Sequence, residues 1–347
     1  MKTPEVCTKN RNYGCRIKKY TADGVEYVAL ENNLVRIEFS TGKGADLTSF
    51  LYKPMDVDFI MHTPIDRKGV FEAVTKASSG GSFFDGYGGG WQELFPTYGG
   101  AANYYGAEIG VHGEACIYPW ETEIIEDTPE KICVVFTLFL KRSPFKLTRK
   151  YTLEENSTKL VLEQTVENTG ANTYEFMWGH HPAFGFPFLD ESVRIKVKGT
   201  PDALVPGNVT GSSDNPFDAE TKGKWPVLKD RTGSDFRLDR AYGAKDRMRL
   251  DYVISNMEEG EIEVFNENLG IGFKMDYDKE LFKHVWIWGL YCGGDTYPWY
   301  GRVYTLGVEP QSSFPANFKL AREAGEVLSL DAGKKLTTTF ISEVTKK

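Results

Sequence analysis

The sequence has few of the features that mark disulfide-bonded, nucleic-acid-binding or membrane proteins. Its five cysteines are scattered and contain no Cys-x-x-Cys pair, so neither a disulfide framework nor a zinc knuckle is expected. Basic residues form no long run, and the net charge of −8 argues against nucleic acid. The longest strongly apolar run, 134–140, is far shorter than a bilayer span, and residues 1–20 lack the apolar region of a signal peptide. We expect a soluble, cytoplasmic protein with no nucleic-acid or membrane partner.

Amphipathic helical patterns are also scarce, and a short helix near 318–324 is the one helix that the sequence indicates. Apolar and polar residues instead alternate, as strands require, in several segments: 34–39, 132–138, 159–166 and 261–265. Turn-forming residues separate these segments. The pattern predicts an all-β fold, a large antiparallel β-sandwich, and residues 1–347 are expected to form a single domain.

One stretch departs from this strand pattern. From about 199 to 249 the chain is polar and rich in Gly, Pro, Asp and Lys. We expect a long, loop-rich excursion between strands. Loops of this length often serve as lids or binding loops, and a surface insertion without such a role is the alternative.

Aromatic residues gather among glycines in the segment 86–100, which contains Trp91, and His112 and Glu114 follow shortly after it. Glycine lets the backbone pass close to a ligand, and flat aromatic rings stack on the apolar faces of sugars. No Lys-Ser or Lys-Thr follows the glycines, which argues against a phosphate-binding loop. The cluster favours a carbohydrate cleft, and ordinary packing of turns and sheets is the alternative.

Two histidines and one glutamate in an apolar segment are the remaining candidates for a functional role. His180 and His181 are adjacent, and on a strand they would face opposite sides, so at most one enters a given cleft. Neither an HxH nor an HExxH spacing is present, which argues against a metal site. Glu309 lies in the otherwise apolar segment 304–311, where a buried carboxylate needs a partner or a chemical task, and exposure at the strand end is the alternative.

The segment 178–184 (WGHHPAF), with 307–310 (GVEP) far downstream, resembles the aldose 1-epimerase (galactose mutarotase) superfamily, and within it the divergent mutarotase-like branch. Residues 30–47 and 149–170 are similar to strands of the same family, and the resemblance covers about 28–340. It implies a supersandwich with a sugar site on a concave sheet. In such enzymes a glutamate takes the proton of the anomeric hydroxyl while a histidine protonates the ring oxygen.

The resemblance assigns His181 as general acid and Glu309 as general base, with His112 hydrogen-bonding the sugar. Further sugar contacts are expected from residues near these motifs: Trp91, Trp178, Trp288, His180 and Glu114. No cofactor or metal is implied. The expected partner is a small-molecule sugar, bound by a monomer or a homodimer.

Two family features are missing from their expected places. The sugar-binding arginine upstream of His112 is replaced by Gly-Gly-Ala at 99–101, and Glu93 is a further candidate contact. The aspartate that binds sugar hydroxyls is one of three residues: Asp239, Asp246 or Asp251. The function that the resemblance predicts is interconversion of sugar anomers. A non-catalytic carbohydrate-binding or sensing protein is the alternative that the missing arginine favours, and the negative net charge makes a lyase or isomerase acting on acidic sugars less attractive.

Overall fold

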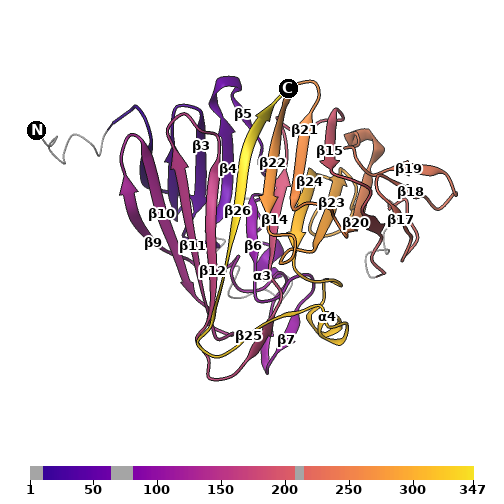
Figure 1. Cartoon of the computed structure of the whole chain (residues 1–347). Coiled ribbons are helices and arrows are strands. Elements are labelled where there is room, and N and C mark those ends of the chain that lie inside the picture. Colours follow the sequence, from indigo (N-terminus) through magenta and orange to yellow (C-terminus); the bar gives the residue numbers. More distant parts are fainter. Residues whose placement is uncertain (1–10, 64–80, 208–214) are drawn as a thin grey trace, which may run out of the picture.

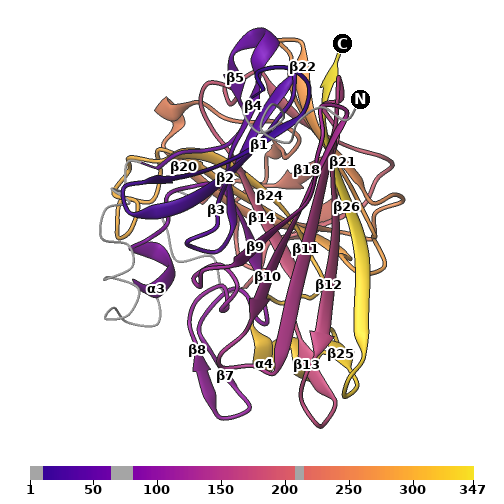
Figure 2. The same cartoon turned by 90° about the vertical axis from the view of Figure 1, so that its left-hand side faces the viewer.

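Two large antiparallel sheets pack face to face in the computed structural model, which describes residues 11–63, 81–207 and 215–347. Figure 1 shows the layers from one side, and Figure 2 shows the smaller sheet on the right with the larger sheet beside it. The predicted antiparallel β-sandwich is confirmed. The four alternating segments form strands, and the predicted short helix is present at Phe318–Glu323.

The larger sheet has 14 strands within the described part of the chain. In spatial order its main path is β1 (Arg16–Ala22), β2 (Val25–Glu31), β3 (Val35–Ser40), β4 (Asp46–Tyr52), β6 (Trp91–Leu94), β14 (Gly179–Phe184), β24 (Tyr304–Gln311), β23 (His284–Tyr291), β20 (Met248–Ser255), β16 (Asp202–Leu204), β17 (Lys222–Lys224), β18 (Val227–Lys229) and β19 (Asp235–Arg237). The short β5 (Val57–Asp58) pairs with β4.

The second sheet has eight strands within the same described residues. Its order is β15 (Val193–Val197), β21 (Glu261–Asn266), β22 (Ile271–Tyr277), β26 (Lys335–Lys346), β12 (Leu160–Asn168), β11 (Phe145–Glu154), β10 (Lys131–Phe139) and β9 (Glu121–Asp127). Two small ribbons pair β7 (Ala102–Tyr104) with β8 (Ala107–Ile109) and β13 (Tyr174–Phe176) with β25 (Leu328–Leu330). The helical elements are short: α3 (Gly81–Phe84), α4 (Phe318–Glu323) and the 3₁₀ turns η1 (Lys53–Met55) and η2 (Ala244–Asp246).

The main core lies between the two sheets. Strand β11 alternates buried and half-buried residues along nearly its whole length, because one face packs on the core and the other faces solvent. Phe39 of the larger sheet contacts Phe136 and Tyr151 of the smaller sheet, with ring centroids 5.3 and 4.5 Å apart. Contacts of this kind join the layers along their length.

A buried ion pair also joins the layers. Arg149 of β11 lies with its Nε 3.2 Å from Glu93 Oε2 of β6, and both side chains are almost fully buried. The Arg149 guanidinium donates to the carbonyls of Gly44 and Ala45 at 3.1 and 2.8 Å and stacks 4.2 Å over the Trp120 ring. Burial raises the pKa of the Glu93 carboxyl, and the neighbouring Arg149 opposes that shift.

Strands β14, β24 and β23 are buried on both faces. Their inner face meets the smaller sheet, whereas α3 and residues 292–303 cover the outer face. Figure 2 shows α3 on the side of the larger sheet that faces away from the smaller sheet. Because both faces are covered, polar side chains on the outer face of these strands are removed from bulk water, and it is here that a candidate site is found.

The expected excursion at 199–249 is more regular than predicted. In the part that the structure describes, β16 to β19 continue the larger sheet beyond β20, so this loop-rich stretch also carries a sheet edge. The short strands escape periodicity analysis because three residues are too few to alternate visibly.

Among the described residues no helix is long and apolar enough to cross a membrane. The four described cysteines, at 15, 116, 133 and 292, carry free thiols. The fifth cysteine of the sequence, Cys7, lies outside the described residues.

Candidate functional site

A cavity of about 430 Å³ opens on the outer face of the larger sheet. Its polar lining comes from three strands of this sheet and one loop: His112, His181, Arg249, Asp251, Glu309 and Gln311. Aromatic rings form much of the remaining wall: Phe83, Phe84, Tyr87, Trp286, Trp288, Tyr297 and Trp299. A mostly aromatic pocket with a few convergent polar groups is the usual form of a small-molecule site.

His181 and Glu309 lie in contact on the floor of this cavity. The Nε2 atom of His181 on β14 is 3.4 Å from Oε1 of Glu309 on β24, and both side chains are buried. Gln311, two residues further along β24 and therefore on the same face, donates from Nε2 to Glu309 Oε2 at 3.0 Å. His181 Nδ1 has no hydrogen-bond partner among the described residues. The two groups that the sequence pairs from a distance of more than a hundred positions are thus brought together.

Burial shifts the pKa of both members of this pair. It raises the pKa of the Glu309 carboxyl well above its ordinary value, and the neighbouring Asp251 carboxylate raises it further. Burial lowers the pKa of the His181 imidazole to about 4. Both shifts favour the uncharged forms, a protonated Glu309 carboxyl beside a neutral His181 imidazole. This distribution is the reverse of the one that the family resemblance implies.

His112 completes the floor from the loop after β8. Its ring lies 5.3 Å from the His181 ring and 4.5 Å from the Phe83 ring, between centroids. The backbone N–H of Gly99 donates to His112 Nδ1 at 3.3 Å, and burial lowers the His112 pKa well below its ordinary value. A neutral ring that accepts at Nδ1 carries its proton on Nε2. His112 is therefore fixed as a hydrogen-bond donor.

The support for His112 requires glycine at position 99. Gly99 has φ +76°, and a Cβ atom there would lie 1.8 Å from the carbonyl oxygen of Ala316. His112 itself has φ +63°, a conformation that costs a residue other than glycine some strain. The glycines that indicate a cleft in the sequence thus position a cavity histidine.

An arginine lines the cavity, but from a place that the sequence does not indicate. Arg249 on β20 donates from Nε to Asp251 Oδ2 at 2.6 Å, and residues 249 and 251 share a strand face. Of the three candidate aspartates, Asp251 lines the cavity. Asp239 pairs with Arg237, and Asp246 accepts from the backbone N–H of Gly243 at 2.8 Å.

Two of the expected sugar contacts, His180 and Trp91, lie on the other side of the sheet. His180 faces the inter-sheet core, where the Trp91 indole N–H donates to its Nδ1 at 3.2 Å and the Gln164 amide lies 2.9 Å from its Nε2. Trp91 contacts Phe340 of the smaller sheet, with ring centroids 5.2 Å apart. Burial lowers the pKa of His180 to about 3. The expectation that these side chains line the cleft is corrected: they hold the sheets together.

Trp178, Glu93 and Glu114 are likewise away from the cavity. Trp178 is fully buried in the core and donates from its indole N–H to Glu93 Oε1 at 2.9 Å. Glu114 is buried under the turn after β10, where Oε1 accepts from the backbone N–H of residues 141 and 142 and Oε2 accepts from Ser143. Both carboxylates have partners within the fold, Glu93 in Arg149 and Trp178 and Glu114 in the turn at 141–143, and neither lines the cavity.

Trp288 of β23 is the one predicted tryptophan that does line the cavity. Its ring lies 5.6 Å from the His181 ring and 5.2 Å from the Trp299 ring, between centroids. The residues that the sequence analysis missed are Phe83, Trp299, Arg249 and Gln311. Gln311 could have been found, because it shares strand parity with Glu309 in a segment already recognised as unusual.

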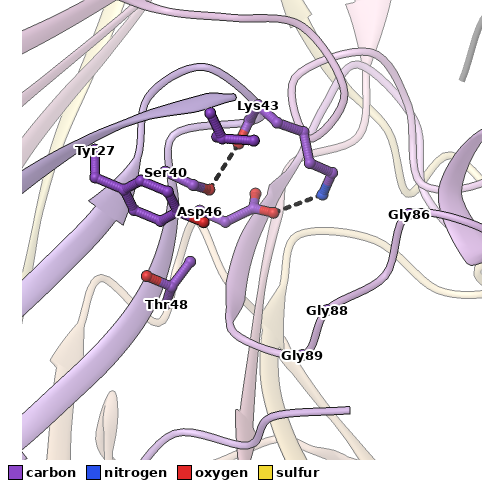
Figure 3. Close-up of a pocket in the computed structure, with 9 residues that line it drawn as sticks. Tyr27, Ser40, Lys43, Asp46, Thr48, Gly86, Gly88 and Gly89 are labelled. Carbon is purple, nitrogen blue, oxygen red and sulfur yellow. Dashed lines mark hydrogen bonds and ion pairs between the residues drawn. The ribbon is translucent and has the colours of Figure 1, made fainter. Parts of the chain in front are cut away.

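A second cavity, of about 20 Å³, lies beside the glycines that flank Tyr87. Figure 3 shows the side chains of Lys43 and Asp46 pointing toward one another there, and Lys43 Nζ is 2.7 Å from Asp46 Oδ2. The backbone of Gly86 and Gly89 lines the same space. The volume is that of about one water molecule, so this cavity is too small for a sugar.

Within the described residues, no three His, Cys, Asp or Glu side chains are grouped so that they could hold a metal ion. The polar groups of the cavity include two histidines, a carboxyl in contact with one of them, and an aspartate paired with an arginine. Such a set is suited to moving protons and to binding hydroxyl groups.

Comparison with solved structures defines the class of fold. A Klebsiella pneumoniae protein provisionally named an aldose 1-epimerase matches with a TM-score of 0.73 and 14% identity, over 95% of this chain and 83% of that chain. A galactose mutarotase-like protein from Lactobacillus casei matches at 0.61 and 16%, over 92% and 100%. A galactose mutarotase related enzyme from Lactobacillus acidophilus matches at 0.58 and 16%, over 95% and 98%. Likeness at this level of identity establishes a galactose mutarotase-like fold, as the sequence resemblance implies, and does not extend to activity.

The sequence also places the chain in a family. Residues 22–344 match the model of a domain of unknown function, DUF4432, and the chain belongs to that family. A comparison with curated proteins finds no significant match.

Proposed function

We propose that the protein interconverts the α and β anomers of a reducing sugar bound in the 430 Å³ cavity. The observation that carries this proposal is the contact between His181 Nε2 and Glu309 Oε1, 3.4 Å apart, on the floor of the cavity. Ring opening needs a proton donor and a proton acceptor at two oxygens that are bonded to the same carbon. A donor and an acceptor that lie side by side suit this requirement.

In the proposed reaction Glu309 gives its proton to the ring oxygen while His181 takes the proton of the anomeric hydroxyl. The bond between C1 and the ring oxygen breaks and leaves an open-chain aldehyde. After rotation about C1–C2, His181 returns its proton to the carbonyl oxygen, the ring hydroxyl attacks C1, and Glu309 recovers its proton. Glu309 and His181 return to the protonation states in which they started, so no external acid or base is consumed, and each transfer is worth about 10²–10⁴ in rate.

The remaining polar groups supply binding. His112, fixed as a donor by Gly99, and the Arg249–Asp251 pair offer both donors and acceptors to sugar hydroxyls. Trp288, next to His181, offers an aromatic face to the sugar ring. In this proposal Arg249 takes the part of the arginine that is missing upstream of His112.

Glu309→Gln tests the proposal, because the amide keeps the shape of the side chain but cannot deliver the proton. Anomer exchange should fall by about 10²–10⁴ while sugar binding is retained. Glu114→Gln is the matched control, since Glu114 is equally buried but lies outside the cavity. The alternative function, carbohydrate binding or sensing without catalysis, predicts that the wild-type protein binds sugars and does not accelerate their exchange.

A further inference from the structure

The mouth of the cavity carries aromatic rings that the proposed proton transfer does not use. Tyr297 lines the cavity, yet half of its surface (50%) is exposed. Its hydroxyl donates to Asp85 Oδ1 at 2.6 Å, and its ring meets Phe84 edge-on with centroids 6.2 Å apart. An exposed aromatic side chain held in place by a hydrogen bond at a pocket entrance is a preformed contact surface.

This outer rim, defined as Phe84 and Tyr297, is separated from the proton-transfer pair. Tyr297 is connected to His181 through Phe84 and Phe83, with successive ring centroids 6.2, 5.5 and 6.2 Å apart. Tyr297 thus contacts Phe84 at the entrance, whereas Phe83 contacts His181 on the floor of the cavity. A sugar ring in contact with His181 and Glu309 leaves the outer rim to a second group of the same ligand.

We infer that the outer rim is a subsite for a second sugar ring, so that the substrate class is a reducing disaccharide or longer oligosaccharide whose reducing end reaches His181 and Glu309. This inference rests on the proposed function for the identity of the inner ring. Aromatic faces at the rim match the apolar C–H faces of a pyranose, and the cavity joins both places in one continuous space.

The charges near the rim favour a neutral second group over an anionic one. Asp85 holds Tyr297 and places a carboxylate there. Two arginines are paired with acids, Arg247 with Asp295 in the loop that carries Tyr297 and Arg249 with Asp251 inside the cavity. A phosphate or carboxylate on the sugar would meet no net positive charge from these groups.

The test compares binding and anomer exchange for glucose, galactose, maltose, cellobiose, lactose and glucose 6-phosphate. The wild-type protein should bind at least one disaccharide about 2- to 12-fold more tightly than the matching monosaccharide, the gain expected of one aromatic contact. Tyr297→Ala should remove that gain and reduce monosaccharide affinity less than disaccharide affinity. Tyr300→Ala is the control, because Tyr300 lies in the same loop and is exposed to a similar extent (56%) but does not line the cavity.

The outcomes separate this inference from the proposed function. Equal affinity for mono- and disaccharides, an equal loss for both in Tyr297→Ala, or tightest binding of glucose 6-phosphate overturns the subsite, even if exchange is accelerated. A disaccharide gain that depends on Tyr297, without any accelerated exchange, supports the subsite and overturns the proposed function. Absence of binding for every sugar tested overturns both.

Discussion

The adjacent histidines offer a sharp prediction, because one holds the fold and the other faces the cavity. Replacing His180 with Leu removes the acceptor of the Trp91 indole N–H and the partner of the Gln164 amide, which lie 3.2 and 2.9 Å from the ring. Each buried polar group left unpaired costs about 1–3 kcal/mol, so the free energy of unfolding should fall by roughly 2–6 kcal/mol.

His181→Leu should behave in the opposite way. The described part of the fold gives His181 Nδ1 no hydrogen-bond partner, and Glu309 keeps its bond from Gln311. Only Glu309 Oε1 loses a partner, so the free energy of unfolding should fall by at most about 1–3 kcal/mol, whereas anomer exchange should fall by about 10²–10⁴. Urea unfolding followed by tryptophan fluorescence measures the first quantity, and polarimetry of a freshly dissolved anomer measures the second. Equal destabilisation by the two substitutions, or full activity in His181→Leu, would refute the assignment of the two histidines to opposite faces.

Three further predictions address the protonation and the core. Burial lowers the His181 pKa to about 4, so kcat/KM at pH 5 should stay within about twofold of its value at pH 7. It should decline only as the pH falls through about 4 and His181 gains a proton. A decline centred near pH 6.5 would contradict this assignment. Asp251→Asn removes a carboxylate that raises the Glu309 pKa, so the alkaline limb of the pH–rate profile, where Glu309 loses its proton, should move to lower pH, and an unmoved limb would argue against this coupling. Arg149→Met leaves Glu93 buried without its cation and should reduce the free energy of unfolding by about 3–5 kcal/mol in a urea titration, whereas a change within 1 kcal/mol would show that the pair is not a structural link.

The sequence predicts the smaller sheet better than the larger one. Strands such as β10 and β12 face solvent on one side, so their apolar residues alternate and reveal them. Strand β14 is buried on both faces and shows no alternation, and β16 to β19 are too short to show any. The strands of the 199–249 region therefore depend on pairing with β20. The apolar and polar residues of the region itself do not indicate that pairing.

The site residues were predicted with mixed success. His181, Glu309 and His112 follow from the family resemblance and Trp288 from the aromatic segment before Glu309, and all four line one cavity. Trp178 was predicted wrongly as a sugar contact. It shares strand parity with His180 and has the opposite parity to His181, which indicated that it faces away from the cavity. The wrong prediction for Trp91 was harder to avoid.

Only the strand register places Trp91 opposite Pro182, and Glu93 opposite His180, on the core face. Aromatic residues near glycines look alike in a sequence whether they line a cavity or a core. Arg249 was missed because its partner strands, β23 and β16, are distant in sequence and its own flank is polar.

The most direct test of the account is exchange spectroscopy on the anomeric protons of a bound and free aldose, with wild-type protein and with Glu309→Gln. The account predicts that wild-type protein transfers magnetisation between the α and β signals faster than buffer alone. The Glu309→Gln protein should still give saturation-transfer contacts to the sugar, but with exchange reduced by about 10²–10⁴. Undiminished exchange in that variant would contradict the central claim that the His181–Glu309 pair moves the proton.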